Sequence, residues 1–128
     1  GDLAAHVAKI ARLRYPEHAI PEGLVANFTL MARVAEEMVQ TAGRSLRERN
    51  AHDAGKLAES DEEMDELRKS QFRVMLDKEW PYTVEAAVDV ALLGRYYERI
   101  ADHAAIMASR VIYVVTGLFP EGENWPVA

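Results

Sequence analysis

The sequence predicts an all-α protein, a long up-down antiparallel three-helix bundle with an extra helix ahead of it. Apolar residues recur at intervals of three and four along most of the chain, which is helical spacing. All prolines lie between or beyond the periodic segments, where helices cannot continue. A single run, residues 111–115, is rich in β-branched side chains, but it lies inside a helical pattern that ends at a glycine. We therefore expect no strands.

Composition narrows the class of protein. A chain of 128 residues with 49% apolar and 28% charged residues suits one folded core. The net charge of −6 argues against nucleic-acid binding, which requires a basic face. No apolar run reaches the ~18 residues that span a bilayer, and no signal-peptide pattern occurs. We expect a cytoplasmic protein without membrane insertion. Without cysteine, metal ligands must be carboxylates or imidazoles.

The first periodic segment ends at Tyr15-Pro16, because proline and the residue before it disfavour further helix. Its apolar members are spaced by three or four: Leu3, Val7, Ile10 and Leu13. No capping residue precedes this pattern. We therefore expect the helix to start upstream of Gly1, and the chain to be a fragment of a longer protein. Residues 17–21 form a connector between two prolines.

The second helix is predicted from about Glu22 to Asn50, followed by a turn at residues 50–53 in which Asp53 caps the next helix. The apolar stripe that predicts this helix is Leu24, Phe28, Met31, Ala35, Met38, Ala42 and Leu46. The third helix is predicted from about Ala54 to Lys78. Rods of this length measure about 40–50 Å at a rise of about 1.5 Å per residue, and short turns make them antiparallel.

The fourth helix is predicted to begin near residues 81–84 and to continue to Thr116. Gly117 can adopt the left-handed conformation of a helix C-cap, and we expect Leu118 to pack behind it. Residues 118–128 then form a tail that contains two prolines and cannot extend the helix.

Two pairs of acidic residues have matching spacing on the third and fourth helices. Asp61 and Asp65 are four residues apart, as are Glu98 and Asp102. Residues at this spacing share a helix face, where two carboxylates repel each other unless a cation lies between them. Two such pairs on neighbouring helices could form a site of four carboxylates, suited to hard cations, iron or manganese.

A metal-free interpretation of the same acids stays open. Residues 61–66 are an acidic run, and such runs are usually solvated helix faces. Basic side chains nearby could also pair with the acids without any metal: Arg68, Lys69, Arg95 and Arg99.

Residues 94–104, GRYYERIADHA, followed by 110–117, RVIYVVTG, resemble the last-helix motif of the PhoU family. Residues 61–67, DEEMDEL, resemble the motif of the preceding helix in that family. Family members repeat this three-helix unit twice, and residues 1–10 are similar to the last-helix motif of a first repeat, without its leading glutamate.

The resemblance implies a domain organisation. Residues 1–16 would be the end of the last helix of a preceding repeat, 17–21 the connector, 22–117 a complete PhoU-like three-helix bundle and 118–128 a C-terminal tail. It also implies that the acidic motifs bind iron, zinc, magnesium or manganese. The metal ligands that it implies are Asp61, Asp65, Glu98 and Asp102. Weaker candidates, as ligands or as residues beside the metal, are Asp2, His103 and Glu62.

The function implied by the resemblance is that of a non-enzymatic cytoplasmic regulator. PhoU-like proteins connect the ATPase subunit of the phosphate ABC transporter to a phosphate-sensing histidine kinase, and they repress the phosphate-starvation response. Homo-oligomers are compatible with this role. No Gly-rich loop or basic helix start is present, so we expect no tight binding of phosphate itself.

Two alternative functions, from other classes of protein, stay open. One is a metal-free helical interaction module. The other is a carboxylate-bridged metalloenzyme, but the Glu-x-x-His motif of such di-iron bundles does not occur in this sequence.

Overall fold

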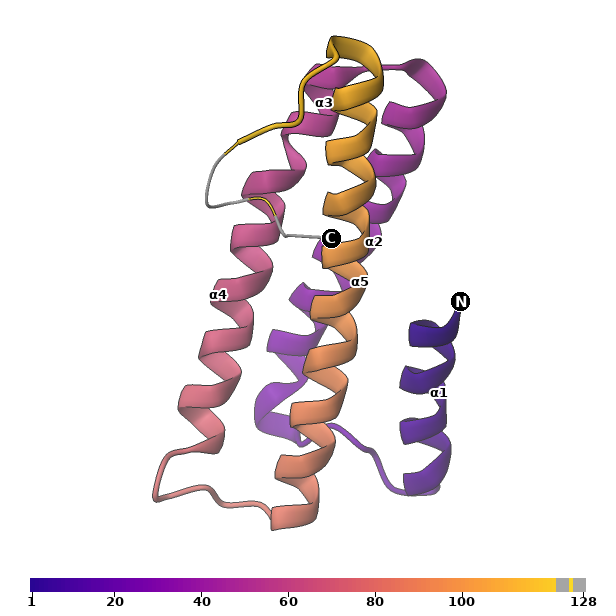
Figure 1. Cartoon of the computed structure of the whole chain (residues 1–128). Helices are drawn as coiled ribbons and strands as arrows, with labels where there is room; N and C mark the ends of the chain where they lie inside the picture. Colours follow the sequence, from indigo (N-terminus) through magenta and orange to yellow (C-terminus); the bar gives the residue numbers. More distant parts are fainter. Residues whose placement is uncertain (122–124, 126–128) are drawn as a thin grey trace.

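The computed structural model describes residues 1–121 and 125, and all regular structure within them is helical, as predicted. The elements in chain order are α1 (Asp2–Arg14), the 3-10 turn η1 (Glu22–Leu24), α2 (Val25–Glu48), α3 (Ala51–Gly55), α4 (Leu57–Met75) and α5 (Val84–Thr116). The three long rods α2, α4 and α5 run up, down and up beside one another, with the short α3 at one end (Figure 1). The antiparallel bundle is confirmed.

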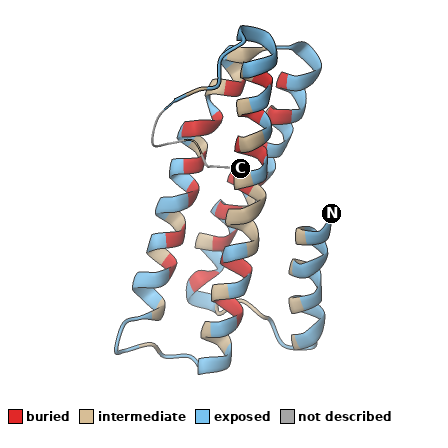
Figure 2. Ribbon diagram, in the orientation of Figure 1, coloured by how far each residue is buried: buried red, intermediate tan, exposed pale blue. Residues whose placement is uncertain are grey.

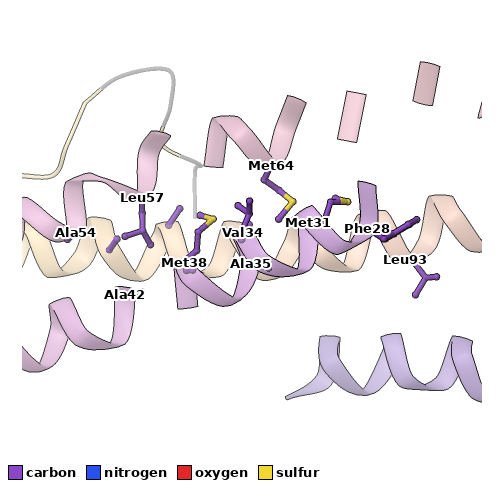
Figure 3. Packing of buried hydrophobic residues seen from close by; sticks show 14 of the residues in the cluster. Phe28, Met31, Val34, Ala35, Met38, Ala42, Ala54, Leu57, Met64 and Leu93 are labelled. Carbon is purple, nitrogen blue, oxygen red and sulfur yellow. The ribbon is translucent and has the colours of Figure 1, made fainter. Parts of the chain in front are cut away.

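The core lies between these rods, where their inward faces are buried (Figure 2). Met31 and Met38 of α2 and Met64 of α4 are almost fully buried (Figure 3). They belong to one cluster with small residues of α5: Ala101, Ala104, Ala105 and Ala108. The predicted stripe of α2 is correct except at its end, where Leu46 is 54% exposed and Ser45 is buried instead. The stripe moves on from Ala42 by three residues rather than four, because helical periodicity is 3.6.

The turn after α2 differs from the prediction that Asp53 caps the third rod. Arg49 adopts a left-handed conformation (φ 52°) and ends α2. Asn50 is the cap, because its side-chain oxygen accepts a hydrogen bond of 3.1 Å from the Asp53 backbone N–H. The third rod therefore starts at Ala51 with the single turn of α3, and it continues as α4 from Leu57.

The third rod also ends earlier than predicted, at Met75 rather than Lys78. The Asp77 side chain accepts a hydrogen bond of 2.8 Å from the Glu79 backbone N–H, a turn that competes with helix. Helix α5 is capped at its start by Thr83, whose hydroxyl oxygen accepts a bond from the Ala86 N–H. The helix spans 33 residues without a break.

Gly117 is the left-handed C-cap of α5, with φ 78°, as the sequence predicted. The predicted packing of Leu118 behind it is wrong, because this side chain is 73% exposed. Phe119 follows the cap instead and stacks on Tyr113, with ring centroids 4.3 Å apart. Most of the predicted tail, residues 122–124 and 126–128, lies outside the described residues.

Helix α1 lies beside α5, on the outside of the three rods (Figure 1). None of its residues is buried (Figure 2), although Val7 and Ile10 pack partly against the core. Its position is consistent with an element that belongs to another unit, and its assignment to a preceding repeat stays a prediction. In the described part of the chain, no helix is both long enough and apolar enough to cross a bilayer.

Candidate carboxylate site

Asp61 occupies a core position of α4. It follows Leu57 by four residues and precedes Met64 by three, and both of these are fully buried, so the same face carries the aspartate inward. The residue is 7% exposed. Its Oδ1 atom is buried and accepts no hydrogen bond from the described residues. A buried carboxylate oxygen without a partner is costly, and a bound ion or water is one way in which proteins offset that cost.

The other three carboxylates lie near Asp61 at the surface between α4 and α5. Asp65 is exposed one turn further along α4, while Glu98 and Asp102 are half-buried on α5. Burial raises the pKa of Asp61 to about 7, and the charges of Asp102, Asp65 and Glu98 contribute to the increase. The two acid pairs therefore lie on one patch of the molecule rather than on opposite sides.

The pKa values of the two neighbouring aspartates, Asp65 and Asp102, are raised as well. Partial removal of solvent by its neighbours raises the pKa of Asp65, although the residue is exposed, and repulsion from Glu98 and Asp102 adds to the increase. Burial also raises the pKa of Asp102, with a further increase from Glu98 that Arg99 and Arg95 oppose. Concentrated negative charge at a protein surface attracts cations, because each bound cation relieves this repulsion.

Two arginines of α5 partly neutralise the patch. Arg95 forms an ion pair with Glu98, and Arg99 Nη1 lies 3.5 Å from Asp102 Oδ2. The other two basic residues considered in the metal-free interpretation do not pair with these acids. Lys69 pairs with Glu66 at 3.0 Å.

Arg68 is buried and is held inside the bundle by uncharged partners. Its guanidinium donates hydrogen bonds to the side chain of Gln71 and to the backbone oxygen of Ala91, and it lies over the Phe72 ring. Burial lowers the pKa of Arg68, against an increase from Glu98. The metal-free interpretation thus accounts for Glu98 and Asp102, but it leaves Asp61 without a partner.

The donor chemistry of the patch fits a hard cation. All four side chains offer carboxylate oxygens, which magnesium, manganese and iron accept, and Asp61 Oδ1 is free to bind one. As the side chains lie, no three Asp, Glu or His residues within 1–121 and 125 are arranged to hold a metal ion. Coordination would require side chains to turn toward one another, so the metal role stays a prediction.

Comparison with known proteins identifies the family. The PhoU domain matches residues 28–111, about two thirds of the chain, including both acidic pairs. The chain belongs to the PhoU family. Two mycobacterial proteins named phosphate-specific transport system accessory protein PhoU homologs are each 48% identical to it. The homolog from Mycobacterium leprae aligns over 98% of this chain and 57% of its own length, and that from Mycobacterium tuberculosis over 94% and 56%.

A more distant PhoU homolog, from Rhizobium meliloti, is 29% identical over 97% of this chain and 53% of its own length. The chain thus spans about half the length of these curated relatives. No solved structure matches it.

The three weaker candidates from the PhoU resemblance lie at the surface of the molecule. Asp2, His103 and Glu62 are all exposed. Asp2 and His103 line the same shallow, mostly apolar groove where α1, α2 and α5 meet.

Sequence reasoning missed a buried polar network beside the acids of this PhoU domain. Gln71 is fully buried, and its amide donates to Asn27 Oδ1 at 2.6 Å and to the Met31 sulfur at 2.7 Å. Asn27 in turn donates to the Leu67 backbone oxygen at 3.2 Å. A signal was present, because Gln71 continues the stripe of α4 by one step of three beyond Arg68.

Proposed function

We propose that this chain is part of a PhoU-like regulator of phosphate uptake. The regulator represses phosphate-starvation signalling and acts in the cytoplasm through protein contacts rather than catalysis. Family membership supports this proposal, as do the curated relatives, which are named accessory proteins of a phosphate-specific transport system. A function of this kind requires binding surfaces, and a long bundle provides them on its outward helix faces.

The proposed partners are the ATPase subunit of the phosphate ABC transporter and the phosphate-sensing histidine kinase. The relatives' names favour the transporter, since they describe accessory proteins of that system. Contact with the kinase rests on the resemblance alone. Self-association into a homo-oligomer belongs to the same proposal, since the outward faces of α2 and α5 carry apolar side chains: Leu30, Val39, Val114 and Val115.

We further propose that Asp61, Asp65, Glu98 and Asp102 hold a divalent or trivalent cation. The observation that carries this proposal is the buried Asp61 Oδ1, which lacks a hydrogen-bond partner and lies among three other carboxylates. A bound cation would supply positive charge between α4 and α5. The aspartates and glutamate would then hold the two helices in one arrangement, which is the form that partners would recognise.

The test is a pull-down of the transporter ATPase subunit and the sensor kinase by the immobilised chain, with and without Mn²⁺. We expect capture of at least one partner, strengthened by Mn²⁺, and loss of the Mn²⁺ effect in Asp61→Asn. Glu63→Gln is the matched control, because Glu63 is an exposed acid on the same helix. Absence of capture under both conditions would contradict the regulatory proposal for this chain. Equal Mn²⁺ binding by wild type and Asp61→Asn would contradict the site.

A further inference from the structure

Glu98 and Asp102 are each paired with an arginine one turn before them on the same helix. Arg95 Nη1 contacts Glu98 Oε1, and Arg99 Nη1 lies 3.5 Å from Asp102 Oδ2. Both pairs have the same i, i+3 spacing. Each carboxylate therefore has one oxygen engaged by an arginine of its own helix.

The arginines engage only the α5 half of the carboxylate site. Asp61 and Asp65 form no ion pair, and no three acids in the described part of the chain stand ready to coordinate an ion. The unpartnered oxygen of Asp61 marks the position where positive charge is missing. The two α5 ligands are thus engaged by internal cations, while the α4 ligands are not.

We propose that Arg95 and Arg99 form a latch that competes with the metal cation for Glu98 and Asp102. This inference rests on the proposed metal site and describes its regulation. In the latched state, the guanidinium groups neutralise the α5 acids. A divalent cation displaces them, and Glu98 and Asp102 then turn toward Asp61 and Asp65.

The strength of the pairs makes displacement feasible. The arginine ends of both pairs reach solvent, with side chains 56% exposed at Arg95 and 41% at Arg99, and ion pairs that reach solvent are weak and screened by salt. A cation of charge +2 between α4 and α5 interacts with several carboxylates at once. Arg68 cannot replace the latch, because Gln71, the Ala91 backbone oxygen and the Phe72 ring hold its guanidinium in place.

The test is calorimetric titration of Mn²⁺ into the full chain and into Arg95→Gln/Arg99→Gln. We expect the double variant to bind Mn²⁺ about four times more tightly, since each of the two lost pairs contributes about a factor of two. Lys69→Gln is the matched control: Lys69 lowers the pKa of Asp65 through its charge but pairs with Glu66. It removes nearby positive charge without removing a latch, so its affinity should change less than about twofold.

NMR of the arginine side chains can tell whether the cation displaces Arg95 and Arg99 from their carboxylates, or whether their positive charge only weakens cation binding from a distance. On addition of Mg²⁺, the guanidinium signals of Arg95 and Arg99 should shift toward those of free arginine. The signal of Arg14 should stay unchanged, because its partner Asp89 lies elsewhere on α5.

The outcomes distinguish the two proposals. Mn²⁺ binding by the wild type with no increase in the double variant, or an equal increase in Lys69→Gln, would overturn the latch and leave the metal site intact. Absence of Mn²⁺ binding in both the wild type and the double variant would overturn the metal site. Binding by the double variant alone would support a latch that closes the site.

Discussion

Arg14 Nε donates a hydrogen bond of 2.6 Å to Asp89 Oδ2, and its Nη2 donates one of 3.1 Å to Asp89 Oδ1. The two residues are 75 positions apart in the chain, and their contact joins the end of α1 to the first half of α5. Asp89 is only 3% exposed, so its charge depends on this partner. Helix α1 buries no residue of its own, so these two hydrogen bonds from Arg14 are an important part of what holds it to α5.

Removal of the Arg14–Asp89 hydrogen bonds should loosen the attachment of α1 to α5. In Arg14→Gln, Asp89 keeps its buried charge without a cation, so we expect the melting temperature to fall by roughly 5–10 °C. Amide hydrogen exchange in residues 2–14 should accelerate more than exchange in the bundle. Glu85→Gln is the control, because Glu85 contacts the same arginine at 3.2 Å from an exposed position. Unchanged protection of α1 in Arg14→Gln would show that apolar contacts alone hold the helix.

Gly94 of α5 lies against two buried side chains of α4 that hydrogen-bond to each other, Arg68 and Gln71. A methyl group at this position would collide with the side chains of Gln71 and Arg68. We expect Gly94→Ala to lower the free energy of unfolding by about 1–3 kcal/mol, the usual range for overpacking, as measured by urea denaturation.

Gly43→Ala is the matched control for that substitution. Gly43 also lies inside a long helix, but the position that a methyl group would occupy there has no neighbouring atom within 4 Å. Alanine has the higher helix propensity, so this variant should be more stable by about 0.5–1 kcal/mol. The same sign of effect at both glycines would contradict the packing explanation for Gly94.

The arrangement of the rods could be predicted from the sequence because it depends on local periodicity. The apolar stripes placed α2, α4 and α5, and the glycine at 117 marked the end of α5. The helix junctions could not be placed as well, since several polar residues compete for each cap. At the turn after α2, both Asn50 and Asp53 can cap a helix, and only the left-handed conformation of Arg49 decides between them.

The acidic patch was partly predictable for the same reason. Spacing of four residues places each acid pair on one helix face, whatever the tertiary structure. The partners of those acids depend on packing between helices, and sequence alone did not show that Arg68 would turn inward to Gln71. The contact of Arg14 with Asp89 was also beyond sequence reasoning, because no local pattern connects positions 75 residues apart.

The cap at the start of α3 provides a test of that turn. Asn50 accepts from the Asp53 N–H and also donates to the Asp53 carboxylate at 3.0 Å. Asn50→Ala should therefore lower the free energy of unfolding by about 1 kcal/mol, as for other N-caps. Asp53→Ala keeps the backbone N–H that Asn50 caps, so its effect in urea denaturation should be smaller. A larger loss for Asp53→Ala would restore Asp53 as the residue that organises the turn.

Asp61 should make the protein less stable as pH rises. Its carboxyl group has an ordinary pKa of 3.8, which burial and the neighbouring acids raise to about 7 in the folded protein. Because the folded state binds this proton more tightly than the unfolded state, ionisation of Asp61 opposes folding. The resulting penalty is absent below about pH 4, grows between pH 4 and pH 7, and is complete at higher pH.

Asp61→Asn removes that penalty and keeps the shape of the side chain. In buffer that contains a chelator, we expect Asp61→Asn to be more stable than the wild type by up to about 4 kcal/mol at pH 8, with little difference at pH 4. Urea denaturation at both pH values measures the difference. Glu63→Gln, at an exposed position on the same helix, should show no such dependence. Added Mn²⁺ should stabilise the wild type and not Asp61→Asn, because a cation offsets the repulsion that the amide has already removed. Parallel pH profiles for wild type and Asp61→Asn would mean that the buried carboxylate is neutralised by some other group.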